Sequence, residues 1–322
     1  MNILEEFLLT AFLLKKKKKK WNKCSLKYNT FKVPILSGLF FMIKQIVYKI
    51  FTKSVGVYIN LLSYLAPTKA VQLAYNLFSK PRDGKLQVDQ LPTVLQQAQT
   101  QTLLFQDQKI QTYTWPGNSH VILLVHGWES NASRWEKLLP YLTKTGSTIV
   151  ALDGPAHGLS SGTTFNIPHY AEFLHQVVQH FQPQTLIGHS LGGKTCLYYQ
   201  SVYQSNNLKK MVILGAPSDF KIILNNYIAL LSLNFRVFTG LKKYYQDVFQ
   251  LNTDEFAAQH FAKNILTQGL LAHDEQDQVV LIHEGKKIAT SWKNATFITT
   301  TGLGHSMHDH NLYEKISQFI QN

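Results

Sequence analysis

A serine between two glycines is the first feature of this sequence that could do chemistry. Residues 188–192 read Gly-His-Ser-Leu-Gly and follow a short apolar run. Glycines two residues before and two after a serine permit a tight turn where a strand meets a helix. The hydroxyl of Ser190 then points out of the turn, above a helix N-terminus with free N–H groups. The pattern favours a nucleophile, and a plain Gly/Ser turn is the alternative.

A serine hydroxyl becomes a useful nucleophile only beside a base, which a third group orients. The candidate base is His305, in the segment "TTTGLGHSMHDH" that follows the last predicted strand. The candidate acid is Asp277, in "LLAHDEQDQVV", again after a predicted strand. The chain order is then Ser, Asp, His, which is one of the orders in which such triads occur.

These residues need elements that bring them together. From about residue 100, apolar runs of strand length alternate with amphipathic helical stretches, which indicates an α/β fold with a mostly parallel sheet. Runs that are apolar on both faces indicate strands covered by helices on both sides. The candidate residues follow such strands, where α/β sheets form their sites. Strands are predicted within residues 102–115, 120–127, 147–154, 184–190, 209–218, 269–280 and 295–302.

Five motifs then occur in the order and at the spacing of one family. They are "LLVHGW" (123–128), "DGPAHGLSSG" (153–162), "GHSLGG" (188–193), "HDEQDQVV" (273–280) and "GLGHSMH" (302–308). On these motifs the chain resembles the α/β-hydrolase superfamily, close to its esterase-like and lipase-like members, over about residues 100–320. The resemblance implies an α/β-hydrolase fold. Such a fold has a twisted, mostly parallel eight-stranded sheet, helices on both faces and a Ser–His–Asp triad.

The resemblance also bears on the choice of acid. Asp277 matches the acid that precedes the paired valines in the family pattern. Asp274, three residues earlier, is an alternative and is expected to brace the loop. Asp219 is a second alternative, because some members carry the acid after an earlier strand.

Two further assignments follow from the resemblance. The Gly-His setting selects His305 over His308 and His310 as the base. The backbone N–H groups of Leu191, after the nucleophile, and of Trp128, after "HG", would stabilise the oxyanion of a tetrahedral intermediate. The scheme calls for no metal and no organic cofactor.

The N-terminal part of the chain differs from the rest. The net charge is +13, but residues 1–53 hold twelve lysines against two glutamates. The remainder is nearly balanced and has no basic stripe for nucleic acid. Residues 1–41 are expected to be a basic leader. It is either a membrane-surface arm or, as we favour, upstream sequence before a true start at Met42. Residues 42–99 are expected to form a helical segment that packs on the enzyme or lies on a membrane.

Residues 100–322 are expected to form the hydrolase domain, with a helical cap over about 219–268. This segment is apolar and aromatic, so as a cap it would line a pocket for a hydrophobic group. An ordinary helical insertion is the alternative.

The predicted function is that of a serine hydrolase. It would cleave a carboxylic ester or thioester of a small to medium hydrophobic substrate through an acyl-enzyme on Ser190. The alternatives are a C–C bond hydrolase or an acyltransferase on the same triad, and a non-catalytic binding protein. We expect a small-molecule substrate, no nucleic-acid partner and a cytoplasmic location, with peripheral membrane contact through the N-terminal segment.

Overall fold

The computed structural model describes residues 34–322, so most of the predicted basic leader lies outside the described residues. The chain divides into two compact units. We call Met1–Phe78 together with Leu224–Tyr244 the helical unit. We call Ser79–Ile223 together with Tyr245–Asn322 the sheet unit.

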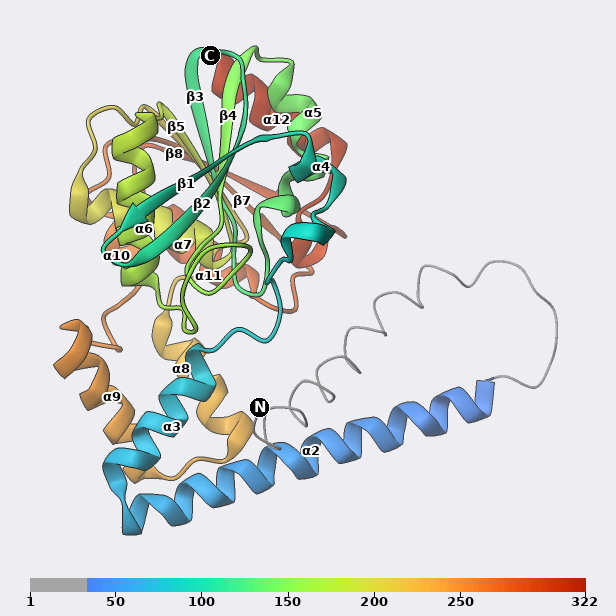
Figure 1. The fold of residues 1–322 in the computed structure, drawn as a ribbon, viewed down its shortest axis with the longest axis vertical. Coiled ribbons are helices and arrows are strands. Elements are labelled where there is room, and N and C mark those ends of the chain that lie inside the picture. The colour runs from blue at the N-terminus through green and yellow to red at the C-terminus, as the bar shows by residue number, and fades with distance from the viewer. Residues whose placement is uncertain (1–33) are drawn as a thin grey trace. The chain divides into compact units, whose positions relative to one another are not determined.

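The sheet unit is built on one eight-stranded sheet with the order β1-β2-β4-β3-β5-β6-β7-β8 (Figure 1). Its strands are β1 (Gln99–Phe105), β2 (Gln108–Trp115), β3 (Asn118–Val125), β4 (Ser147–Leu152), β5 (Thr185–His189), β6 (Lys210–Leu214), β7 (Gln268–Asp274) and β8 (Ala295–Thr300). Strand β2 runs antiparallel to both β1 and β4, and every other neighbouring pair is parallel. The predicted mostly parallel sheet is confirmed.

Helices cover both faces of this sheet. One layer contains α6 (Ile167–Phe181), α7 (Leu191–Tyr203), α10 (Ala258–Ala262) and α11 (Ile282–Ser291), and the other contains α4 (Thr93–Gln96), α5 (Leu139–Thr143) and α12 (His310–Gln321). Strand β3 shows why the sequence takes this form. Ile122 and Leu124 pack in the core cluster with Leu312 and Ile316 of α12. Leu123 between them is equally buried, so the strand reads as a continuous apolar run.

The helical unit contains α2 (Pro34–Leu65), α3 (Pro67–Ser79) and most of α8 (Phe220–Leu231) and α9 (Phe235–Phe249). Pro67 ends the predicted first helix and begins the second, because the first turn of a helix does not need a proline N–H. Helices α8 and α9 belong to the helical insertion between β6 and β7 that the resemblance predicts. No helix among residues 34–322 is both long and apolar enough to cross a membrane.

Contacts over long sequence separations hold the helical unit together. The side-chain amide of Asn60 donates to the carbonyl of Ser232, 172 residues away, at 2.8 Å. Its oxygen accepts the backbone N–H of Asn234 at 2.7 Å. A Cβ at Gly56 would lie 1.7 Å from the carbonyl oxygen of Leu231, so only glycine permits this approach. The structure thus packs part of the predicted N-terminal segment, 42–99, against part of the predicted cap, 219–268. The sequence pattern gives no sign of this contact.

Candidate active site

Ser190 stands at the turn from β5 to α7 in a strained backbone conformation, with φ 55° and ψ −126°. Residues other than glycine rarely adopt positive φ, and such strain is concentrated at functional sites. The Ser190 N–H donates to the carbonyl of Leu214 on β6 at 2.8 Å. A Cβ at Gly192 would lie 2.3 Å from the carbonyl oxygens of Val125 and His126, so the second glycine of the motif is required by close packing.

The three predicted side chains meet at the carboxyl end of the sheet. His305 lies in the short 3-10 turn Gly304–Ser306 after β8. Its Nε2 is 2.9 Å from Oγ of Ser190, and its Nδ1 is 2.7 Å from Oδ2 of Asp277. A carboxylate only accepts hydrogen bonds, so Nδ1 carries the proton and Nε2 is left to accept from the serine hydroxyl. The imidazole is 19% exposed, while the carboxyl is fully buried.

The surroundings of Asp277 favour its ionised form. Burial alone would raise the pKa of this carboxyl. The hydrogen bonds from His305 and from the N–H groups of Val279 and Val280 outweigh it and hold the pKa below its usual value. The carboxylate therefore stays charged at neutral pH, where it orients the imidazole and stabilises its protonated form.

The two alternative acids are engaged elsewhere. Asp274, at the end of β7, accepts hydrogen bonds from the hydroxyl of Thr300 and the N–H of Leu303, each at 2.9 Å. These bonds brace the loop after β8. Asp219 lies 2.6 Å from the ammonium group of Lys287. The structure thus places Asp277, and not these two carboxylates, against the base.

The backbone N–H of Leu191, at the start of α7, and the loop that contains Trp128 lie beside Ser190. A Cβ built on Gly127 would lie 2.9 Å from Cβ of Ser190 and 3.5 Å from the nitrogen of Leu191. Within the described part of the chain, neither the Leu191 nor the Trp128 N–H donates a hydrogen bond. The indole of Trp128 packs edge-on against Phe165, with ring centroids 5.5 Å apart.

Two side chains that the sequence pattern did not assign to the site hold the segment around the base. Nε2–H of His189 donates to the carbonyl of His305 at 2.7 Å. Burial holds the pKa of His189 well below its usual value, so this imidazole is neutral. The guanidinium of Arg134 donates to the carbonyl of Ser306 at 3.0 Å. His189 lies inside the motif that drew attention to Ser190, whereas nothing in the sequence singles out Arg134.

A buried lysine lies one turn beyond the nucleophile. Nζ of Lys194 donates to the carbonyls of Ser218 at 2.7 Å and Phe256 at 3.0 Å, near the two ends of the insertion between β6 and β7. Burial lowers the pKa of this amine to about 7, although Asp219 and Glu284 oppose the shift. No group of three or more potential ligands suited to a metal ion occurs among residues 34–322.

Comparison with known proteins identifies the fold. Residues 120–254 match the model of the alpha/beta hydrolase fold. A putative lipase from Acinetobacter baumannii superposes with a TM-score of 0.55 at 20% identity, covering 73% of this chain and 98% of the lipase. The sheet unit therefore has the α/β-hydrolase fold. A bromoperoxidase from Bacillus anthracis also superposes on this chain, with a TM-score of 0.55 at 17% identity, covering 70% of this chain and 100% of the peroxidase.

Proteins similar to this chain at the sequence level include an esterase and a serine hydrolase-like protein. The bifunctional esterase/perhydrolase DCH of Acinetobacter calcoaceticus is 24% identical over 242 residues, which span 60% of this chain and 87% of the relative. A serine hydrolase-like protein of Danio rerio is 29% identical over 141 residues, 42% of this chain and 40% of the relative. The family match and these relatives support hydrolase activity.

Proposed function

We propose that this protein is a serine hydrolase that cleaves a carboxylic ester or thioester of a small to medium hydrophobic substrate. The hydrogen-bonded chain from Ser190 through His305 to Asp277 carries the proposal, with contacts of 2.9 and 2.7 Å. The related esterase and serine hydrolase-like proteins support the same chemistry.

In the acylation step, Oγ of Ser190 attacks the substrate carbonyl while Nε2 of His305 takes the hydroxyl proton. The carboxylate of Asp277 holds the proton at Nδ1 and stabilises the imidazolium that forms. The negative charge on the carbonyl oxygen is met by the N–H groups of Leu191 and Trp128. The tetrahedral intermediate then collapses. The leaving alcohol or thiol departs with the proton from Nε2, and the acyl group stays on Ser190.

Water completes the cycle by the reverse sequence. His305 takes a proton from water, and the resulting hydroxide attacks the acyl carbonyl. The same two N–H groups bind the second oxyanion, and the proton returns to Oγ of Ser190 as the acid is released. The proposed hydrophobic preference comes from the apolar and aromatic sequence of the insertion over about 219–268.

Labelling with a fluorophosphonate tests the nucleophile directly. The wild-type protein is expected to become labelled, and Ser190→Ala is expected to lose the label. Ser306→Ala is the matched control, because this exposed serine follows His305 in the chain but its hydroxyl donates to the carbonyl of Leu303. Retention of the label in Ser190→Ala would reject Ser190, and an unlabelled wild-type protein would favour a non-catalytic binding role.

A series of p-nitrophenyl esters tests the substrate class. The rate is expected to rise and then fall as the acyl chain lengthens from acetate to laurate. Equal rates across the series would contradict a selective hydrophobic pocket. Transfer of the acyl group to an added alcohol in preference to water would indicate an acyltransferase. Labelling without ester turnover would point to C–C bond hydrolysis.

A further inference from the structure

Charge is divided unevenly between the two units. The described residues of the helical unit contain seven Lys and Arg and not one Asp or Glu. The sheet unit contains sixteen basic and seventeen acidic residues. The excess positive charge of this protein therefore belongs to the helical unit, whose first 33 residues add nine lysines and two glutamates. A surface of one sign attracts oppositely charged partners and repels its own kind.

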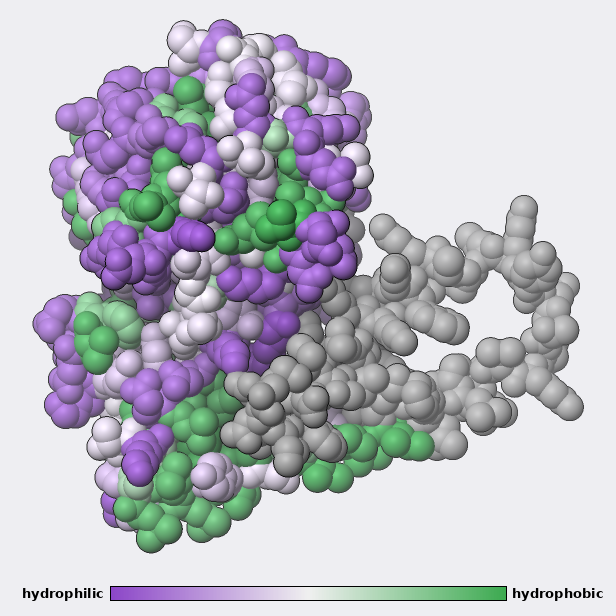
Figure 2. Space-filling model, in the orientation of Figure 1, coloured by the Kyte–Doolittle hydropathy of each residue, from purple (hydrophilic) through white to green (hydrophobic). Residues whose placement is uncertain are grey.

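Helix α2 also leaves an apolar face exposed to solvent. Ile50 and Leu61 are each 62% exposed, and Leu65 is 86% exposed. The exposed apolar residues of α2 recur at intervals of three, four and seven residues, which places them on one side of the helix. Hydrophobic surface over the helical unit is visible in Figure 2. An apolar stripe of this kind on a protein surface marks an interaction site. The stripe is formed by Ile43, Ile46, Ile50, Val57, Leu61 and Leu65.

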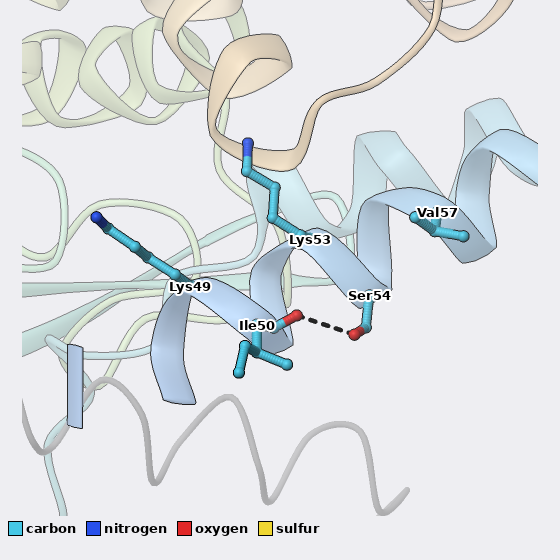
Figure 3. A pocket seen from close by; sticks show the side chains of 5 residues that line it. All are labelled: Lys49, Ile50, Lys53, Ser54 and Val57. Atoms are coloured by element: carbon cyan, nitrogen blue, oxygen red, sulfur yellow. Dashed lines mark hydrogen bonds between the residues drawn. The ribbon is translucent and has the colours of Figure 1, made fainter. Parts of the chain in front are cut away.

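The opposite side of α2 is fixed within the helical unit. Val55 and Ile59 are buried, and Gly56 packs against the backbone of Leu231. The stripe is therefore the outward side of an anchored helix. Figure 3 shows Lys49 and Lys53 leaving α2 on the side away from the exposed Ile50, and Nζ of Lys53 donates to the carbonyl of Ala229 at 3.0 Å.

We propose that the helical unit docks on the surface of an anionic lipid bilayer. The apolar stripe of α2 inserts at the level of the headgroups, and the summed positive charge of the unit attracts it to the lipid phosphates. Interfacial helices bind in this way, through apolar burial together with attraction to anionic headgroups. A second copy of the chain is a poorer occupant, because it would bring the same positive unit, without Asp or Glu among its described residues, to the contact. An anionic bilayer complements both the charge and the stripe.

Sedimentation of the full chain with lipid vesicles tests the proposal. Vesicles of phosphatidylcholine with phosphatidylglycerol are compared with vesicles of phosphatidylcholine alone. We expect about tenfold more binding to the anionic vesicles. This excess should fall as salt is added, because salt screens surface charge.

Paired substitutions test whether vesicle binding requires the stripe itself or any exposed apolar side chain. Ile50→Asp with Leu61→Asp is expected to weaken vesicle binding by about tenfold or more, because two exposed apolar contacts are replaced by charges. The matched control is Leu104→Asp with Leu266→Asp, at sites 72% and 84% exposed in the sheet unit. It should bind vesicles like the wild type.

Three results would overturn the proposal. The first is equal binding to neutral and anionic vesicles. The second is undiminished binding by the Ile50→Asp, Leu61→Asp variant, with circular dichroism confirming that it is folded. The third is a wild-type dimer in light scattering that the same variant dissociates, which would make a second copy the occupant. The Ser190→Ala variant should bind vesicles like the wild type, so this test does not depend on whether the proposed catalysis is correct.

Discussion

The two units of this protein differ in how far they bury their apolar side chains. In the sheet unit, the residues from Ile122 to Val125 on β3 are completely buried between two layers of helices. In the helical unit, α2 buries Ile59 but leaves Ile50 and Leu61 mostly exposed. One unit completes its core from its own residues, whereas the other keeps apolar surface that its own helices do not cover.

This contrast shows two ways of building function into one chain. The sheet unit depends on individual hydrogen bonds, such as the 2.7 Å contact between His305 and Asp277, so single substitutions should abolish its chemistry. In our proposal, the helical unit binds through summed properties, charge and apolar area, to which each residue adds a small share. Its function should decline by steps as residues are replaced.

The largest expected effect is a loss of the proposed catalysis in the sheet unit alone. His305→Ala removes the base and should lower kcat for a water-soluble ester by about 10⁵-fold. Vesicle binding by this variant should equal that of the wild type. Ester hydrolysis within tenfold of wild type would reject His305 as the base, and a parallel loss of vesicle binding would show that the units are coupled.

A second test sharpens the comparison between neighbouring carboxylates. Asp277→Asn should lower kcat by about 10⁴-fold, because the amide no longer stabilises the imidazolium. Asp274→Asn should instead lower the free energy of unfolding by about 1–3 kcal/mol, because bonds to Thr300 and Leu303 are weakened. Kinetics and urea unfolding measured on both variants check this. The reverse pattern would assign the acid to Asp274.

A third test perturbs the packing of the helical unit. Gly56→Ala places a methyl group where the carbonyl oxygen of Leu231 lies, so α2 must shift. We expect a loss of about 2–3 kcal/mol in local stability, seen as faster hydrogen exchange along α2 and α8. Exchange in β5 and α7 should not change. Ser54→Ala, on the exposed side of the same helix, is the control and should leave exchange as in the wild type.

A fourth test concerns the pH dependence of stability that the buried Lys194 should cause. Its pKa is lowered to about 7 in the folded protein from 10.5, so between these values the unfolded chain binds more protons. Wild-type stability should therefore rise with pH across this window and be flat below it. Relative to Lys194→Met, which does not titrate, the wild-type free energy of unfolding should rise as the pH increases through this window. Urea unfolding across the window measures it, and parallel curves for the two proteins would contradict the shift.

The sheet and the position of its loops could be predicted because the signals are local. A strand covered on both faces is a continuous apolar run, as residues 120–125 show. The serine between two glycines marks a strand-to-helix turn for steric reasons that the packing of Gly192 bears out. Parallel strands then bring loops from distant parts of the chain to one edge.

The rest depends on contacts that the sequence does not encode locally. Asp274 and Asp277 follow the same strand three residues apart, and only the direction of each side chain distinguishes their partners. Periodicity marks the apolar side of α2 but does not reveal that Asn60 binds Ser232. A lysine ordinarily indicates a solvent-exposed position, so the burial of Lys194 was not foreseen.

The backbone conformation at Ser190 also restricts which side chains this turn can present as a nucleophile. A φ of 55° tolerates an unbranched side chain but penalises a second substituent on Cβ. Sulfur could therefore replace oxygen, whereas an added methyl group could not be accommodated. Ser190→Cys should still form a covalent acyl adduct, and Ser190→Thr should form none. Any lineage that keeps this turn is thereby confined to nucleophiles carried on an unbranched Cβ.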